Sequence, residues 1–180
     1  MTKLNKSQNI ALIYLFDSYY TEGFVTTACI GITEWRSEDI EFEKMNFSEI
    51  TSKYVSGQFY KRELPGILEL LDDVKLKSDD YIVLDGYVYL DDIGTRGLGG
   101  YLFEELENSI PIIGVAKNRY KSIGDKCIEL LRGESKKPLY VTSAGIEIEK
   151  SSEYILLMSG EFRIPKMFKL VDTISREKAK

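Results

Sequence analysis

The sequence predicts an α/β fold in which a mixed β-sheet, built from an antiparallel three-strand meander plus parallel strands, is flanked by helices. Short apolar runs rich in β-branched residues at 10–16 and 24–33 are typical of strands. The run at 81–84 is uninterrupted, as in a parallel strand buried on both faces. Helical apolar spacing begins near residue 59, between the meander and this strand. We expect residues 1–180 to form a single domain.

The meander occupies the first quarter of the chain. Residues 10–16 form the first expected strand, and a polar turn at 21–23 joins it to a second strand at 24–33 as an antiparallel hairpin. Residues 37–47 show partial alternation of apolar and polar side chains, which predicts the third strand.

Helices and strands alternate in the rest of the chain. Apolar spacing from Phe59 is roughly helical, and Pro65 predicts that the regular helix begins near it. The later elements, each bounded by glycine, proline or polar residues, are expected as a strand at 81–84, a helix at 97–106, a strand at 110–115, a short helix at 123–131, a strand at 139–142, a helix at 151–158 and a helix at 165–174.

The composition excludes several kinds of chemistry. The chain has no histidine, so any acid–base or metal site must use carboxylates, lysine or tyrosine. Its net charge of −5 gives no overall positive field of the kind that indicates nucleic-acid binding. Two cysteines in apolar contexts predict free thiols, and no leader or apolar run near ~20 residues is present. We therefore expect a cytoplasmic monomer with no membrane partner.

Two of the predicted strands end in an aspartate. Asp17 follows the strand at 10–16, and Asp85 follows the strand at 81–84, with Gly86 next to it. Ligands of open α/β sheets bind beyond the carboxyl ends of the strands, and a glycine there lets a substrate approach the backbone. Either aspartate alone also fits a turn or helix N-cap. With Glu63 on the first helix, the order of elements is the layout of ribonuclease H-like nucleases.

Five local patterns occur in the order in which one known family has them. They are Asp17 after the first strand, Lys53-Tyr54-Val55-Ser56-Gly57 followed by Arg62-Glu63, Asp85-Gly86-Tyr87-Val88, the block from Pro111 to Lys117, and Arg163-Ile164-Pro165 with Asp172. Together they resemble the endonuclease V family, whose members cut DNA, and in some cases RNA, one phosphodiester 3′ of deoxyinosine or inosine. The resemblance extends from Ile10 to about Asp172.

The resemblance implies a metal-dependent endonuclease. Mg²⁺, for which Mn²⁺ can substitute, prefers oxygen ligands and keeps several waters, so carboxylates suffice without histidine. Asp17 and Asp85 are expected as direct metal ligands, and Glu63 as a third ligand or as the group that orients the attacking water. Lys117 is expected to act as a positive charge on a phosphate or on the developing negative charge.

The resemblance also implies contacts to DNA or RNA. Tyr54 would wedge into a base step, and Gly57 and Gly86 would let the backbone approach a base edge. Arg163, with neighbouring lysines, would follow the phosphates. Taken singly, Tyr54 also fits ordinary packing, and the basic residues also fit a solvated helix face.

The sequence departs from the family at its histidines. Tyr87, Tyr101 and Ile146 stand where the family has histidine, and Val88 replaces a glycine. Three hypotheses remain: an active endonuclease, a homologue that binds nucleic acid without cutting it, and a protein-interaction domain that keeps only the fold. Three clustered carboxylates favour the first, because without a cation they would repel one another.

Overall fold

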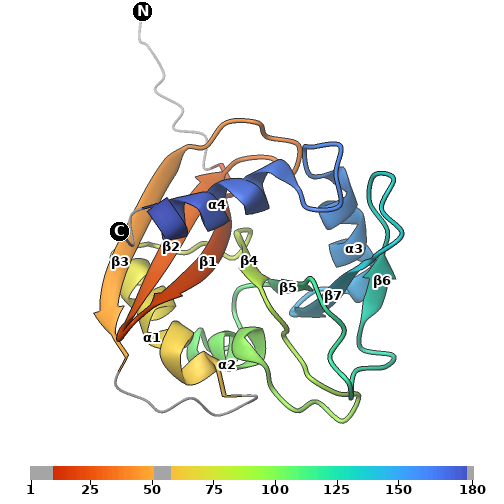
Figure 1. Cartoon of the computed structure of the whole chain (residues 1–180), viewed down its shortest axis with the longest axis horizontal. Helices are drawn as coiled ribbons and strands as arrows, with labels where there is room; N and C mark the ends of the chain where they lie inside the picture. Colours follow the sequence, from red (N-terminus) through yellow and green to blue (C-terminus); the bar gives the residue numbers. More distant parts are fainter. Residues whose placement is uncertain (1–9, 51–57, 178–180) are drawn as a thin grey trace, which may run out of the picture.

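The computed structural model describes residues 10–50 and 58–177. Within these ranges, seven strands form one mixed sheet in the order β3-β2-β1-β4-β5-β7-β6 (Figure 1). The strands are β1 (Ile13–Thr21), β2 (Phe24–Ile32), β3 (Phe42–Glu49), β4 (Tyr81–Asp85), β5 (Ile112–Ala116), β6 (Ile128–Leu130) and β7 (Leu139–Ala144). The helices are α1 (Tyr60–Leu71), α2 (Leu98–Glu105), α3 (Ile148–Leu157) and α4 (Lys166–Glu177).

The sheet confirms the predicted topology. Strands β1, β2 and β3 pair antiparallel in chain order, while β1, β4 and β5 pair parallel. Strands β7 and β6 extend the other edge by antiparallel pairing. This is the ribonuclease H-like arrangement, and it places β4 at the centre of the sheet, between β1 and β5.

Alternating side chains build a hydrophobic core on each face of the sheet. Ile13 and Leu15 of β1 pack with residues of α3 and α4, whereas Tyr14 and Phe16 pack with residues of α1 and α2. Figure 1 shows α4 across one face of the meander and α1 and α2 on the other. Side chains at odd positions of β1 therefore point toward α4, and those at even positions point toward α1.

Several predicted boundaries are wrong: the first strand begins at Ile13 rather than 10, the third begins at Phe42 rather than 37, and two further differences lie near the acids. Strand β1 does not end at Phe16: its parallel pairing with β4 stops there, but its antiparallel pairing with β2 continues to Thr21. Helix α1 begins at Tyr60 rather than near Pro65, since backbone hydrogen bonds to the carbonyls of residues 58 and 59 already start its first turn. Pro65 removes only the single bond that its missing N–H would have made.

The helix predicted at 123–131 is also wrong. Residues 128–130 form strand β6, which pairs with β7 through Ile128↔Val141 and Leu130↔Leu139. The apolar residues at 128 and 130 fit the two-residue period of a strand, and pairing with a distant strand decides between the two periods.

No helix in the described ranges is long and apolar enough to cross a membrane. Both Cys29 and Cys127 are free thiols, as predicted.

Two glycines shape the backbone at the tip of β4. Gly86, directly after Asp85, has φ +153°, and a Cβ at this position would meet no atom within 4 Å. Gly114 on β5 lies under the turn, because a Cβ there would stand 2.6 Å from the Gly86 carbonyl oxygen and 2.8 Å from the Val88 nitrogen. The chain therefore turns tightly over β5 and leaves open space beside Gly86.

Candidate functional site

Three predicted acids meet at the end of the parallel strands. Asp17, Glu63 and Asp85 all line one cavity of about 10 Å³, close to the smallest space that holds a water molecule. Asp17 and Asp85 leave the sheet on the face covered by α4, whereas Glu63 comes from α1 on the opposite face. Asp17 and Asp85, from one face, meet Glu63, from the other, just beyond Phe16↔Leu84, where the β1–β4 pairing ends.

The Asp85 carboxylate forms an ion pair with Lys117. Lys117 Nζ lies 2.5 Å from Asp85 Oδ2, and the lysine side chain keeps 39% of its surface exposed. Burial acts to lower the pKa of Lys117, but the charge and hydrogen bond of Asp85 outweigh it, so the pKa lies above its ordinary value. Lys117 was predicted to act on a phosphate, and this role stays a prediction; in the structure its partly exposed side chain contacts Asp85.

Asp17 is held in an acidic environment by helix α4. Ser175 Oγ donates a hydrogen bond to Asp17 Oδ2 at 3.2 Å, and the negative charge of Asp172 on the same helix acts on Asp17. Burial, followed by repulsion from Asp85 and Asp172, raises the pKa of Asp17 to about 7. Asp17 is therefore largely protonated below neutral pH when no cation is present.

Asp172 is a fourth acid of the site that the site prediction omitted. Arg176 binds it through two hydrogen bonds of 2.9 Å, to both carboxylate oxygens. Burial acts to raise the pKa of Asp172, but Arg176 outweighs it, so the pKa lies below its ordinary value. The only sequence signal for this residue was its place in the closing segment of the family resemblance.

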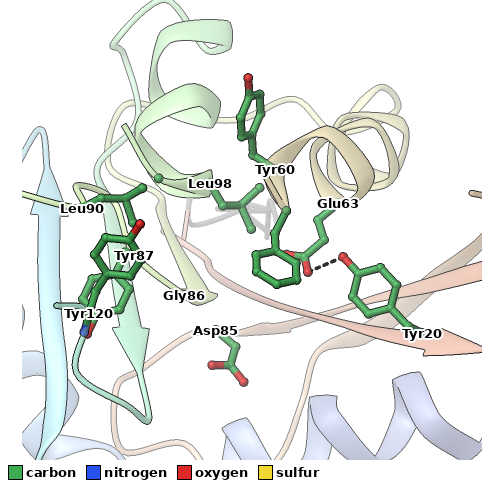
Figure 2. Close-up of a pocket in the computed structure, with 11 residues that line it drawn as sticks. Tyr20, Tyr60, Glu63, Asp85, Gly86, Tyr87, Leu90, Leu98 and Tyr120 are labelled. Atoms are coloured by element: carbon green, nitrogen blue, oxygen red, sulfur yellow. Dashed lines mark hydrogen bonds between the residues drawn. The ribbon is translucent and has the colours of Figure 1, made fainter. Parts of the chain in front are cut away.

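Glu63 has a neutral partner instead of a cation. Tyr20 Oη donates a hydrogen bond of 2.7 Å to Glu63 Oε1, and Figure 2 shows the carboxylate directed at that hydroxyl. Burial raises the pKa of Glu63 to about 7, with smaller contributions from Asp17 and Asp85. The four acids thus fall into two pairs: Asp85 and Asp172 contact cations, whereas Asp17 and Glu63 have raised pKa values.

The raised pKa of Glu63 predicts how the stability of the metal-free protein depends on pH. The folded state binds the proton more tightly than the unfolded chain, so this contribution is complete below pH 4.5 and is lost as the pH rises through about 7. Above that pH, Glu63 alone should lower the free energy of unfolding by about 3 kcal/mol. Urea unfolding of the wild type and Glu63→Gln between pH 5 and 8, with chelator present, measures the difference. Parallel pH profiles for the two proteins would contradict the expectation.

A large pocket opens beside the acids. It has a volume of about 320 Å³, within the size range of small-molecule sites. Five aromatic rings, two leucines, two glycines and two acids line it, namely Tyr20, Phe59, Tyr60, Tyr87, Tyr120, Leu90, Leu98, Gly86, Gly97, Glu63 and Asp85 (Figure 2). The pocket offers flat apolar walls next to two carboxylates.

Tyr87, which stands where the family has a histidine, forms hydrogen bonds within the chain. Tyr87 Oη donates a hydrogen bond to the Asn118 carbonyl at 2.7 Å and accepts one from the Tyr120 backbone N–H at 3.0 Å. It thereby ties the turn after β4 to the loop after β5, which begins with Lys117. Tyr101 stacks on Tyr60 with ring centroids 3.8 Å apart.

The other predicted residues have different outcomes. Gly86 lines the pocket, and its approach to a base edge stays a prediction. Arg163 donates hydrogen bonds to the carbonyls of Lys117 and Pro138, and its contact with nucleic acid stays a prediction. Tyr54 and Gly57 lie outside the described residues.

Metal ligation likewise stays a prediction. Among residues 10–50 and 58–177, no three His, Cys, Asp or Glu side chains are grouped so that they could hold one metal ion. In the same residues Lys117 contacts Asp85, and Tyr20 contacts the Glu63 carboxylate.

Comparisons with known proteins agree on one family. The family model for Endonuclease V matches residues 2–173. A protein of Trichormus variabilis named Endonuclease V is 22% identical over 178 residues, covering 87% of this chain and 78% of its own length. The crystal structure of the catalytic domain of human Endonuclease V superposes with a TM-score of 0.78 at 20% identity, covering 96% of this chain and 83% of that one.

Some of the similar structures contain nucleic acid. Ciona intestinalis Endonuclease V, in complex with a 24mer DNA containing an inosine followed by a ribo-adenosine, has a TM-score of 0.77 at 17% identity. The likeness covers 95% of this chain and 87% of that one. The family model spans nearly the whole sequence and includes all four clustered acids, and on this match the chain belongs to the Endonuclease V family of nucleases.

Proposed function

We propose that this protein is a metal-dependent endonuclease that cleaves a phosphodiester bond near deoxyinosine, inosine or another altered nucleotide in DNA or RNA. The observation that carries the proposal is the meeting of Asp17, Glu63 and Asp85 at one cavity, beside a pocket large enough for a base. Membership of the family supports the reaction class, and the Ciona relative binds DNA that contains inosine.

The chemistry of the donor groups, although not their present spacing, fits a hard divalent cation. Four carboxyl groups are gathered at one end of the sheet, and the two that lack a cationic partner have pKa values raised to about 7. Such an excess of buried negative charge is what a divalent ion neutralises, and carboxylate oxygens are the ligands that Mg²⁺ and Mn²⁺ prefer. Asp17 and Asp85 would hold the ion directly, with Glu63 as a further ligand. When bound, Mg²⁺ activates water and neutralises charge on the leaving oxygen.

The chain's own residues supply positioning and charge. Glu63, which lines the pocket, would orient the attacking water. Lys117 is exposed enough to move from Asp85 to a substrate phosphate and to stabilise negative charge as it develops there. Asp172, which binds Arg176, would complete the acidic cluster from the side of α4.

The pocket is suited to a base turned out of its stack. Its aromatic walls can stack on either face of a purine, and the bend at Gly86 leaves room for a base edge to reach the backbone. Tyr54 and Gly57 precede Phe59, a residue of the pocket wall, in the sequence, and we propose that they contact the neighbouring base step. Arg163 is proposed to contact the phosphates.

The test is a cleavage assay on matched oligonucleotides. Labelled single- and double-stranded DNA with one deoxyinosine, and RNA with one inosine, are incubated with protein and Mg²⁺ or Mn²⁺. We expect cleavage at one position near the modified base, none with chelator, and none in the same sequence carrying adenosine. Failure to cut any substrate with either metal would overturn the proposal. If salt-sensitive binding remained in that case, the protein would be a homologue that binds without cutting.

We also propose that the whole chain is one domain that acts as a monomer in the cytoplasm. The continuous seven-strand sheet of the described ranges and the two free thiols support this. Light scattering on the purified protein checks the mass, and a dimer would contradict it.

A further inference from the structure

The position of the Glu63 carboxylate depends on a residue with no assigned role. Tyr20 Oη donates a 2.7 Å hydrogen bond to Glu63 Oε1, and this contact joins two elements, β1 and α1 (Figure 2). Glu63 is the fourth residue of its helix, and the ion pairs found in the described ranges do not include it. A bond from a neutral hydroxyl fixes one oxygen of the carboxylate and leaves the other oxygen free to act.

Tyr20 is itself held rigidly. It belongs to the part of β1 that extends beyond the parallel ladder, where it pairs with Val25 of β2. Asp17, three residues earlier on the same strand, pairs with Ala28. Because a strand advances about 3.3 Å per residue, the strand sets Tyr20 roughly 10 Å beyond Asp17. The two side chains leave opposite faces of β1, Tyr20 toward α1 and Asp17 toward α4.

The ring of Tyr20 also forms a wall of the substrate pocket. It lines the pocket of about 320 Å³ next to the acids and a second hollow of about 430 Å³ on its other side. Phe59 lines the same two hollows. A base in the first pocket would therefore touch the same side chain that orients Glu63.

We propose that Tyr20 is a positioning residue for Glu63, holding one carboxylate oxygen so that the other faces the reacting phosphodiester. The inference rests on the proposed function and adds a residue to it. Through the strand that Tyr20 shares with Asp17, the hydrogen bond sets the place of the helix-borne acid relative to the strand-borne acids. Because the Tyr20 ring lines the pocket, Glu63 is held next to the bound base.

Tyr20→Phe tests the proposal, because it removes one oxygen and keeps the ring. Losing a hydrogen bond to a charged group should lower kcat about 10- to 100-fold, with KM within about twofold of wild type. Tyr14→Phe is the matched control: it removes a hydroxyl from the same face of the same strand, beside Phe42 and away from the acids. We expect wild-type kcat for this control, and thermal unfolding of both variants checks that they are folded.

A double-mutant comparison shows whether Tyr20 acts through Glu63. In a Glu63→Gln background, adding Tyr20→Phe should lower kcat no further. An equal loss in both backgrounds, a change in KM alone, or wild-type kinetics for Tyr20→Phe would each reject the positioning role while leaving the nuclease proposal intact. If the wild type cut none of the inosine substrates, the proposed function itself would fail, and this inference would fall with it.

Discussion

Asp85→Asn is expected to lower kcat for metal-dependent cleavage about 1,000-fold or more, because a carboxylate that neutralises a bound cation is worth several kcal/mol to the transition state. Asp85 ends the central strand and lines both the small cavity shared with Asp17 and Glu63 and the larger aromatic pocket beside it. Asparagine has the same shape but no charge, so the substitution tests charge separately from packing. Single-turnover cleavage of an inosine-containing oligonucleotide with saturating enzyme and Mg²⁺ measures the loss.

The variant should still bind substrate. Removing a negative charge from the site lowers its repulsion of phosphates, so binding without metal should equal or exceed that of the wild type. Asp73→Asn, an exposed acid in the turn after α1, is the matched control and should cleave normally. Cleavage by Asp85→Asn within tenfold of the wild type would remove Asp85 from the catalytic groups.

Lys117→Met should have the next largest effect, a loss of about 100-fold in kcat. The ammonium lies 2.5 Å from Asp85 Oδ2, and the lysine side chain is 39% exposed, so a substrate phosphate could approach it. A preorganised charge at a developing oxyanion typically contributes about this much. Methionine keeps the length of the side chain and removes the charge. Single-turnover rates with Mg²⁺ provide the measurement.

Two comparison variants, Lys117→Arg and Lys121→Met, separate the effect of charge at position 117 from geometry and from charge elsewhere in the loop. Lys117→Arg keeps the charge and should recover part of the rate, because the guanidinium is larger but still cationic. Lys121→Met removes an exposed charge from the same loop and should weaken binding at most, with kcat unchanged at saturating enzyme. A normal kcat for Lys117→Met would show that the lysine only balances the charge of Asp85.

Local sequence patterns were sufficient for the meander, the central strand and the acid at its tip. The run at 81–84 is apolar throughout because β4 is buried on both faces, and such a strand can carry a polar group only where it ends. Gly86 follows for an equally local reason, since the turn after Asp85 adopts a positive φ. Helix α4 was also predictable, because its apolar residues repeat at helical spacing.

The partners of these acids came only from the tertiary structure. Tyr20 meets Glu63 across 43 residues of sequence, and Ser175 meets Asp17 across 158. Neither contact leaves a periodic pattern, because each depends on how far β1 continues beside β2 and on how α1 and α4 pack on opposite faces of the sheet. For the same reason, pairing with β7 overrode the helix predicted at 123–131. The sequence by itself determined the central strand and the acid at its end, since burial and turn geometry act over a few neighbours. The packing of distant elements decided which side chains hold those residues in place, and with them the charge and protonation of the site.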